Sequence, residues 1–225
     1  MRTRVTSGWD LVGPVCGILA MVGYVGAVWL NPMRGLGVRP EQPAETIAAA
    51  MAARLGDTSQ LERFAGPMVL MLAVVFFLGF LGFLHQRLQE RSAESRRWIA
   101  TVFLGGGLVL AAALLFQGFI VLTQTTVVDL AGDAQVAKTL YLLDWLGLAI
   151  VVPGVAAMTG AAALLTLRDG ALHLSLGALA IVAFAATFVM YWVPVWLLWV
   201  LITSLFLLVR PEPTAVRVSA GRDLA

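Results

Sequence analysis

Two polar side chains stand inside long apolar stretches of this sequence and could do chemistry there. Asp144 lies in Leu-Tyr-Leu-Leu-Asp-Trp-Leu-Gly-Leu, and Gln117 lies in the apolar run before it. A carboxylate within a membrane-spanning helix costs about 3 kcal/mol, so it is a functional candidate by default. It can attract a cation, accept hydrogen bonds or donate a proton. Asp144 and Gln117 are therefore the first candidate site residues.

The elements that must position them are five apolar blocks, at residues 11–30, 66–84, 98–122, 140–167 and 171–209. A span needs ~20 mainly apolar residues to cross ~30 Å of hydrocarbon. The last block has 39 residues and no charge, so as one helix it would reach ~58 Å. We expect it to reverse at Tyr191–Pro194, giving spans at 171–190 and 194–209. The sequence predicts an all-α transmembrane bundle of six spans in one domain, residues 1–225.

Composition restricts the class of protein further. Hydrophobic residues make up 60% of the chain, charged residues 12%, and the mean hydropathy is +0.90, unlike a soluble domain. The charges sit in loops rather than on one basic face, so no nucleic-acid partner is expected. Cys16 is the single cysteine, His85 ends the second predicted span, and His173 begins the fifth. These residues predict no disulfide, no metal site and no cofactor.

The charge distribution predicts the orientation. With the N-terminus inside, ten arginines fall on the inner segments and five basic residues on the outer ones. The positive-inside rule then places both termini in the cytoplasm of a bacterial cytoplasmic membrane. The alternative is a five-span protein with its C-terminus outside.

The outer loop, residues 31–65, contains a predicted short helix. Pro43 opens the segment, Gly56 closes it, and Ile47, Met51 and Leu55 recur every four residues on one face. Ser59-x-x-Glu62 fits a capping box that starts the next helix. This extracytoplasmic helix is expected to face protein or headgroups. The loop is either a connector that folds back on its bundle or a lid over a cavity.

Glycines indicate where helices approach each other. Gly13-x-x-x-Gly17, Gly79-x-x-Gly82 and Gly105-Gly106-Gly107 place small residues on single helical faces. In lipid, helix association relies on close packing, so these faces are predicted helix–helix contacts.

Depth suggests that the polar residues share a site. Gln117 lies 19 residues from Trp98 and Asp144 lies 23 from Leu167, so antiparallel helices would place both in the outer third of the membrane. Aromatic residues at overlapping depth complete the predicted ligand-binding set: Tyr141, Trp145, Trp192, Trp196 and Trp199. Such a pocket suits a lipophilic ligand with one polar or cationic end. The alternative is that Asp144 is an interfacial residue and the aromatic rings form the interfacial belt.

Several short motifs follow one another along the chain in an order that resembles a known family. They are Asn31-Pro32 ending a span, Phe80-Leu81-Gly82-Phe83-Leu84 before a basic loop, Gly105-Gly106-Gly107, and Asp144-Trp145. The chain resembles the uncharacterised six-helix membrane proteins of actinobacteria, a resemblance that implies a fold and no activity.

A purely architectural likeness is to small integral-membrane terpene cyclases, which use acidic residues in an aromatic-lined bundle. Those enzymes usually have seven spans and more than one essential carboxylate, and only Asp144 fits here. Two functions are therefore open. One is a protein that binds a lipophilic small molecule or partner among membrane lipids. The other is an enzyme that cyclises an isoprenoid by protonation, with Asp144 as general acid.

Overall fold

The chain forms an all-α bundle. The computed structural model describes residues 8–33, 35–131, 133–189 and 195–209, and these ranges contain no strand. The elements are α1 (Gly8–Leu30), α2 (Ala44–Gly56), α3 (Gln60–Arg91), the 3₁₀ turn η1 (Glu94–Arg96), α4 (Arg97–Ala131), α5 (Ala134–Asp169), α6 (Leu174–Val189) and α7 (Val195–Val209).

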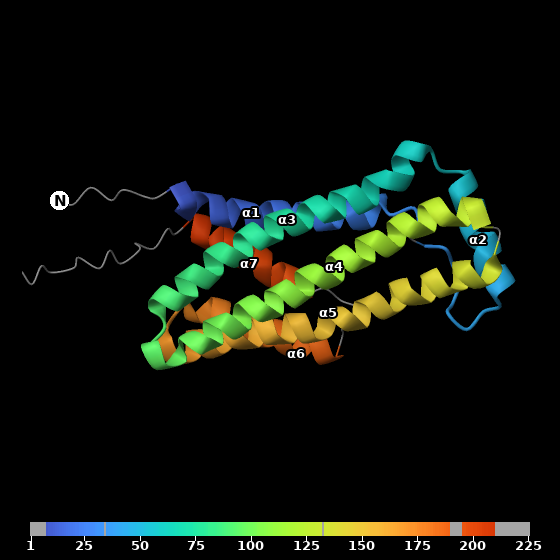
Figure 1. Ribbon diagram of the computed structural model, residues 1–225. Helices are drawn as coiled ribbons and strands as arrows, with labels where there is room; N and C mark the ends of the chain where they lie inside the picture. The colour runs from blue at the N-terminus through green and yellow to red at the C-terminus, as the bar shows by residue number, and fades with distance from the viewer. Residues whose placement is uncertain (1–7, 34, 132, 190–194, 210–225) are drawn as a thin grey trace, which may run out of the picture.

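The six apolar helices pack as a closed ring in chain order. Each of α1, α3, α4, α5, α6 and α7 contacts the next, and α7 returns to α1 (Figure 1). Large side chains fill the interior, with Phe80, Phe103 and Trp199 fully buried. Apolar residues also cover the outside of the ring, and Leu72, Phe119 and Phe188 are all more than half exposed. An apolar exterior of this extent is typical of a surface that faces lipid.

Within the described residues, four helices are long and apolar enough to cross a membrane by length and composition. These candidate spans are Asp10–Leu30, Gln60–Arg91, Glu94–Thr126 and Ala134–Asp169. The apolar helices α6 and α7 are shorter, with 16 and 15 residues, or ~24 and ~22 Å at 1.5 Å per residue. The reversal expected at Tyr191–Pro194 lies outside the described residues.

A close contact between backbones joins α4 to α5 at two glycines. A Cβ placed on Gly106 would come within 2.6 Å of the Met158 backbone nitrogen and 2.8 Å of the Gly154 carbonyl oxygen. A Cβ on Gly154 would lie 2.7 Å from the backbone nitrogen of Leu110. By contrast, Gly82 and Gly105 have nothing within 4 Å of an added Cβ. The glycine stretches therefore mark close approaches, but only some of their members make them.

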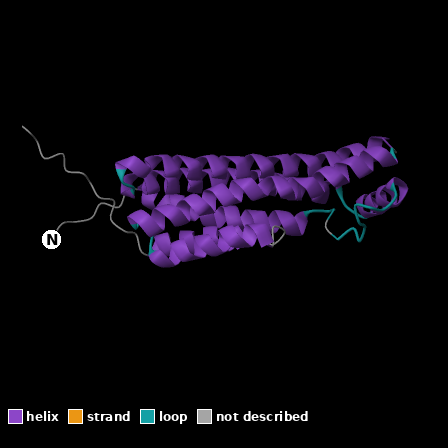
Figure 2. Ribbon diagram, turned by 90° about the horizontal axis from the view of Figure 1, so that it is seen from below, coloured by secondary structure: helices purple, strands orange, loops and turns teal. Residues whose placement is uncertain are grey.

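Helix α2 packs on the ends of α4 and α5, at the end of the bundle farthest from the start of α1 (Figures 1 and 2). The predicted helix is confirmed, with Pro43 as its N-cap and Ile47, Met51 and Leu55 completely buried. They form a small cluster with Met33 and Ala137, separate from the main core. The predicted capping box at Ser59 and Glu62 is also present.

Hydrogen bonds fix the segment around α2 in place. Tyr141 Oη donates to the Val38 carbonyl oxygen over 2.9 Å, and Lys138 Nζ donates to that of Gln42 over 2.9 Å. Arg54 Nε donates to the Pro32 carbonyl oxygen over 3.0 Å. In this structure the loop is a connector that folds back on its own bundle.

At the opposite end of the bundle, a charged pair connects two segments of the chain. Arg96 of η1 donates from Nε to Oδ1 of Asp169 over 2.7 Å, which ties the α3–α4 connection to the end of α5. His85 Nδ1 lies 2.9 Å from the Ala100 carbonyl oxygen, and His173 Nδ1 lies 2.8 Å from Ser175 Oγ. The two imidazoles thus have different polar partners, and both histidines lie at this end of the bundle.

Candidate functional site

Asp144 lies on α5 and faces α4. The side chain of Gln117 on α4 lies beside its carboxylate. Its Oδ1 atom is buried and has no hydrogen-bond partner among the described residues. Tyr24 of α1 and Tyr141 of α5 both lie within electrostatic range of the carboxylate. Asp144 is therefore partly enclosed by protein and is not a water-exposed interfacial residue.

A second glutamine extends this polar contact towards the α2 end. Gln124 of α4 is 1% exposed, and its Nε2 donates to the Leu140 carbonyl oxygen over 3.0 Å. Leu140 lies one helical turn before Asp144, and Gln117 lies two turns before Gln124. The Oε1 atom of Gln124 is buried and also lacks a partner within the described part of the chain. We call Gln117, Gln124 and Asp144 the polar seam.

Two adjoining pockets lie beside the polar seam. The central pocket is lined by α1, α3, α4 and α7 and has about 270 Å³ of empty space, which includes its open mouth. The end pocket, nearer α2, has about 380 Å³ on the same measure. It is lined by Asn31 and Gln117 as well as by apolar residues of α1, α3 and α4. Tyr24 and Leu70 line both pockets.

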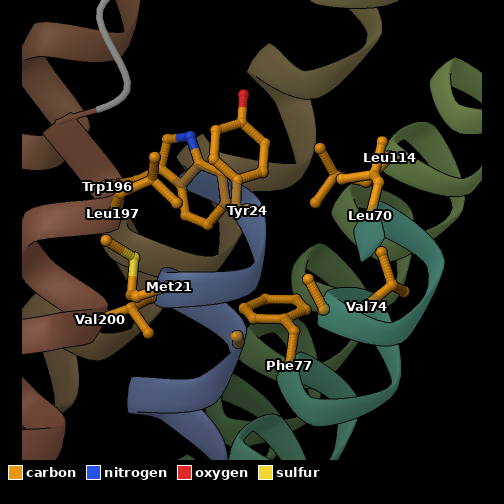
Figure 3. Close-up of a pocket in the computed structure, with 11 residues that line it drawn as sticks. Met21, Tyr24, Leu70, Val74, Phe77, Leu114, Trp196, Leu197 and Val200 are labelled. Atoms are coloured by element: carbon orange, nitrogen blue, oxygen red, sulfur yellow. The ribbon is translucent and has the colours of Figure 1, made fainter. Parts of the chain in front are cut away.

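The central pocket is apolar and has aromatic walls. The Tyr24 and Trp196 rings meet edge to face with centroids 5.9 Å apart, and Phe77 meets Trp196 in the same way at 6.1 Å. In Figure 3 the Tyr24 hydroxyl points away from Phe77, so the polar end of this side chain leaves the apolar space. Tyr24 therefore separates an apolar compartment from one with polar walls.

The sequence predicted one cavity holding Asp144, Gln117 and Trp196. Instead Gln117 lines the end pocket, Trp196 lines the central pocket, and Asp144 lines neither of them but lies beside Gln117. The prediction assumed that similar depth means a shared cavity. The space is divided into two pockets, and Tyr24 and Leu70 line both of them.

The other predicted ligand-binding residues lie apart from the pockets. Trp199 is fully buried, and its Nε1 donates over 3.2 Å to the carbonyl oxygen of Leu176 near the start of α6. It also packs edge-on against Phe103, far from the α2 end. Trp145 is 49% exposed on the outside of the ring, and Tyr141 holds the loop before α2. Trp192 lies outside the described residues.

The reason for the position of Trp199 is physical. A buried indole N–H needs an acceptor, and Trp199 finds one in the Leu176 carbonyl oxygen of the neighbouring helix. The side chain therefore reaches across to α6.

Sequence reasoning missed Tyr24 and Gln124 as members of this site. Tyr24 was not among the predicted ligand-binding residues, and it lies six residues before the end of α1. Gln124 shares a helical face with Gln117, because seven residues are close to two turns. That spacing of two carboxamides in an apolar helix was the signal that could have identified it.

Comparisons with known proteins find no family model, no curated protein and no solved structure that matches this chain.

Proposed function

We propose that this protein is a six-span protein of the bacterial cytoplasmic membrane with both termini in the cytoplasm. We further propose that it binds a lipophilic ligand with a polar end in the two adjoining pockets. In this orientation the α2 end of the bundle is the outer end, and the pockets lie in its outer half.

The six-span arrangement is supported by the packing of the two short helices. α6 contacts α5, α7 contacts α1, and the hairpin thereby completes the ring. The end residues Val189 and Val209 are each more than three-quarters exposed, and neither helix contains a charge. Such surfaces are stable in lipid and costly in water. The hairpin therefore belongs in the same apolar medium as the four long helices.

Reporter fusions test this topology. A reporter fused after Ala225 should be active only as a cytoplasmic protein, because the excess of arginines keeps that end inside. The same reporter inserted after Asp57, which is exposed just beyond α2, should behave as external. An external C-terminus would contradict six spans.

The ligand proposal depends on one observation: a pocket whose lining includes Asn31 and Gln117 adjoins an apolar, aromatic pocket, and Tyr24 and Leu70 belong to both. Along α1 the lining runs from Ala20 to Asn31, about 16 Å at 1.5 Å per residue. An amphiphile matches this order, with its chain along the apolar residues of the central pocket and its polar end beside Gln117. Ligand pockets are typically apolar with a few polar groups that fix orientation.

A substitution that fills both pockets tests whether they bind a ligand. In the purified full chain in detergent, dodecanol should raise the unfolding temperature with a saturable dose response, since a ligand that binds the native state stabilises it. Leu70→Trp should fill both pockets and weaken this response about tenfold or more. Leu72→Trp is the matched control, because Leu72 is 55% exposed on the same helix. Equal responses in the two variants would show that dodecanol acts on the lipid-facing surface, and the proposal would fail.

An enzyme that protonates an isoprenoid is the alternative function. The unpartnered Oδ1 of Asp144 favours it, because a proton donor must reach its substrate. However, Asp144 lines neither pocket, so its carboxylate is not shown to reach a molecule held there. Binding is therefore the function that the geometry supports best.

A further inference from the structure

The end of the bundle opposite α2 carries an excess of positive charge. Residues 91–97 and 168–169 contain four arginines and two acidic residues, and Figure 1 shows the α3–α4 connection beside the end of α5. Arg96 Nε donates to Asp169 Oδ1 over 2.7 Å, and the Ala93 backbone nitrogen donates to Oδ2 over 3.3 Å. Both carboxylate oxygens of Asp169 are therefore bound within the protein, and the charge of Arg96 is neutralised there.

Arg97 and Arg168 flank this pair and keep their charges uncompensated by a direct partner. Each is the chain neighbour of one member of the pair, and consecutive Cα atoms lie 3.8 Å apart, so both belong to the same part of the surface. Both are exposed, and neither guanidinium forms a hydrogen bond or ion pair with the described residues. Guanidinium groups bind the oxygens of phosphate with paired hydrogen bonds. The two arginines therefore form a candidate phosphate site.

An exposed apolar residue stands directly beside each of these arginines. Trp98 follows Arg97 and Leu167 precedes Arg168, and both apolar side chains are more than half exposed. Two turns further along the same face of α4, Gly105 is exposed, with nothing within 4 Å of an added Cβ. Positive charge at the end of the helices thus gives way at once to an open apolar face. A phospholipid has the same order, with a phosphate followed by acyl chains.

We propose that Arg97 and Arg168 bind the phosphate of an anionic phospholipid, with an acyl chain along α4 from Trp98 towards Gly105. An anionic lipid is favoured over a zwitterionic one because the ammonium group of the latter would meet like charge. This site is separate from the two pockets, so the inference goes beyond the proposed ligand binding. In the proposed orientation it faces the cytoplasmic leaflet.

Two phospholipids that differ only in their head group test the preference for charge. Dioleoylphosphatidylglycerol and dioleoylphosphatidylcholine are titrated into the full chain in non-ionic detergent, with the unfolding temperature as readout, since a ligand of the native state raises it. The phosphatidylglycerol should half-saturate at about a tenfold or more lower concentration, because two arginines attract it. Glycerol phosphate, which has the anionic group without acyl chains, should have no effect over the same range.

Single substitutions identify the residues responsible. Arg97→Gln and Arg168→Gln should each raise the half-saturating concentration of phosphatidylglycerol about fivefold and leave that of phosphatidylcholine unchanged. Arg39→Gln is the matched control, because it removes the same charge from an exposed arginine near α2 and should keep the wild-type preference. Leu70→Trp should keep it too, since Leu70 lines the two pockets and not the arginine site.

Equal half-saturation by the two lipids in the wild-type chain would overturn the inference, even where an arginine variant does not fold. An equal loss of preference in Arg39→Gln and Arg97→Gln would show general attraction between charges and would also overturn it. A preference abolished by Leu70→Trp would place the lipid in the pockets instead. Glycerol phosphate acting at the same concentrations as the lipid would show a site for free anions and refute the lipid.

Discussion

Met51→Asp is expected to release α2 from the bundle while the ring of six helices stays folded. Met51 is completely buried between α2 and the ends of the long helices. Truncating such a side chain costs about 2–5 kcal/mol, and an unpaired carboxylate in the same place adds a further desolvation penalty. The small cluster around α2 is separate from the main core, so the damage should stay local.

Hydrogen exchange measures this release. Amides of residues 44–56 should lose their protection, and trypsin should cut after Arg54, whereas α3 and α4 should remain protected. Ala52→Asp is the matched control. Ala52 lies next to Met51 on the same helix but is exposed, so a charge at this position stays in water. Unchanged protection of α2 in Met51→Asp would mean that this helix does not depend on its buried face.

Gly106→Ala is expected to destabilise the whole ring. The added methyl group would lie 2.6 Å from the Met158 nitrogen and 2.8 Å from the Gly154 oxygen, both of which are backbone atoms. Backbone atoms cannot swing aside, so α4 and α5 must separate, and overpacking of this kind costs about 1–3 kcal/mol. The gain in helix propensity from glycine to alanine, about 1 kcal/mol, offsets only part of this cost.

The neighbouring glycine provides the comparison. Gly105 has open space around an added Cβ, so Gly105→Ala should leave stability unchanged or raise it by up to about 1 kcal/mol. Thermal unfolding of the purified variants in detergent measures the difference. Equal stabilities of the two variants would show that the α4–α5 contact is looser than the backbone distances indicate.

These two residues also show what a sequence pattern leaves open. Gly105, Gly106 and Gly107 were equivalent members of one glycine stretch, and only the positions of α5 and α3 separate them. Gly106 faces the backbone of α5, Gly107 faces the side chain of Leu81, and Gly105 faces outward. A periodic pattern identifies a face of a helix, but the partner of each residue on that face depends on how the next helix crosses it.

The sequence by itself determined the local features of this protein. Apolar runs gave the helices, because backbone groups in an apolar medium must be paired within the helix. The four-residue recurrence of Ile47, Met51 and Leu55 determined the buried face of α2. Ser59 and Glu62 determined the start of α3, since a cap depends on residues three apart.

Tertiary structure alone decided the candidate site. Asp144 and Gln117 were recognised as costly residues, but their contact, the role of Tyr24 and the division into two pockets depend on side chains from separate helices. Depth along a span could not reveal that Trp199 reaches Leu176 instead of the pocket. Local rules act over a few residues of one helix, whereas a site between helices is determined by crossing angles and by the acceptor that each buried donor finds.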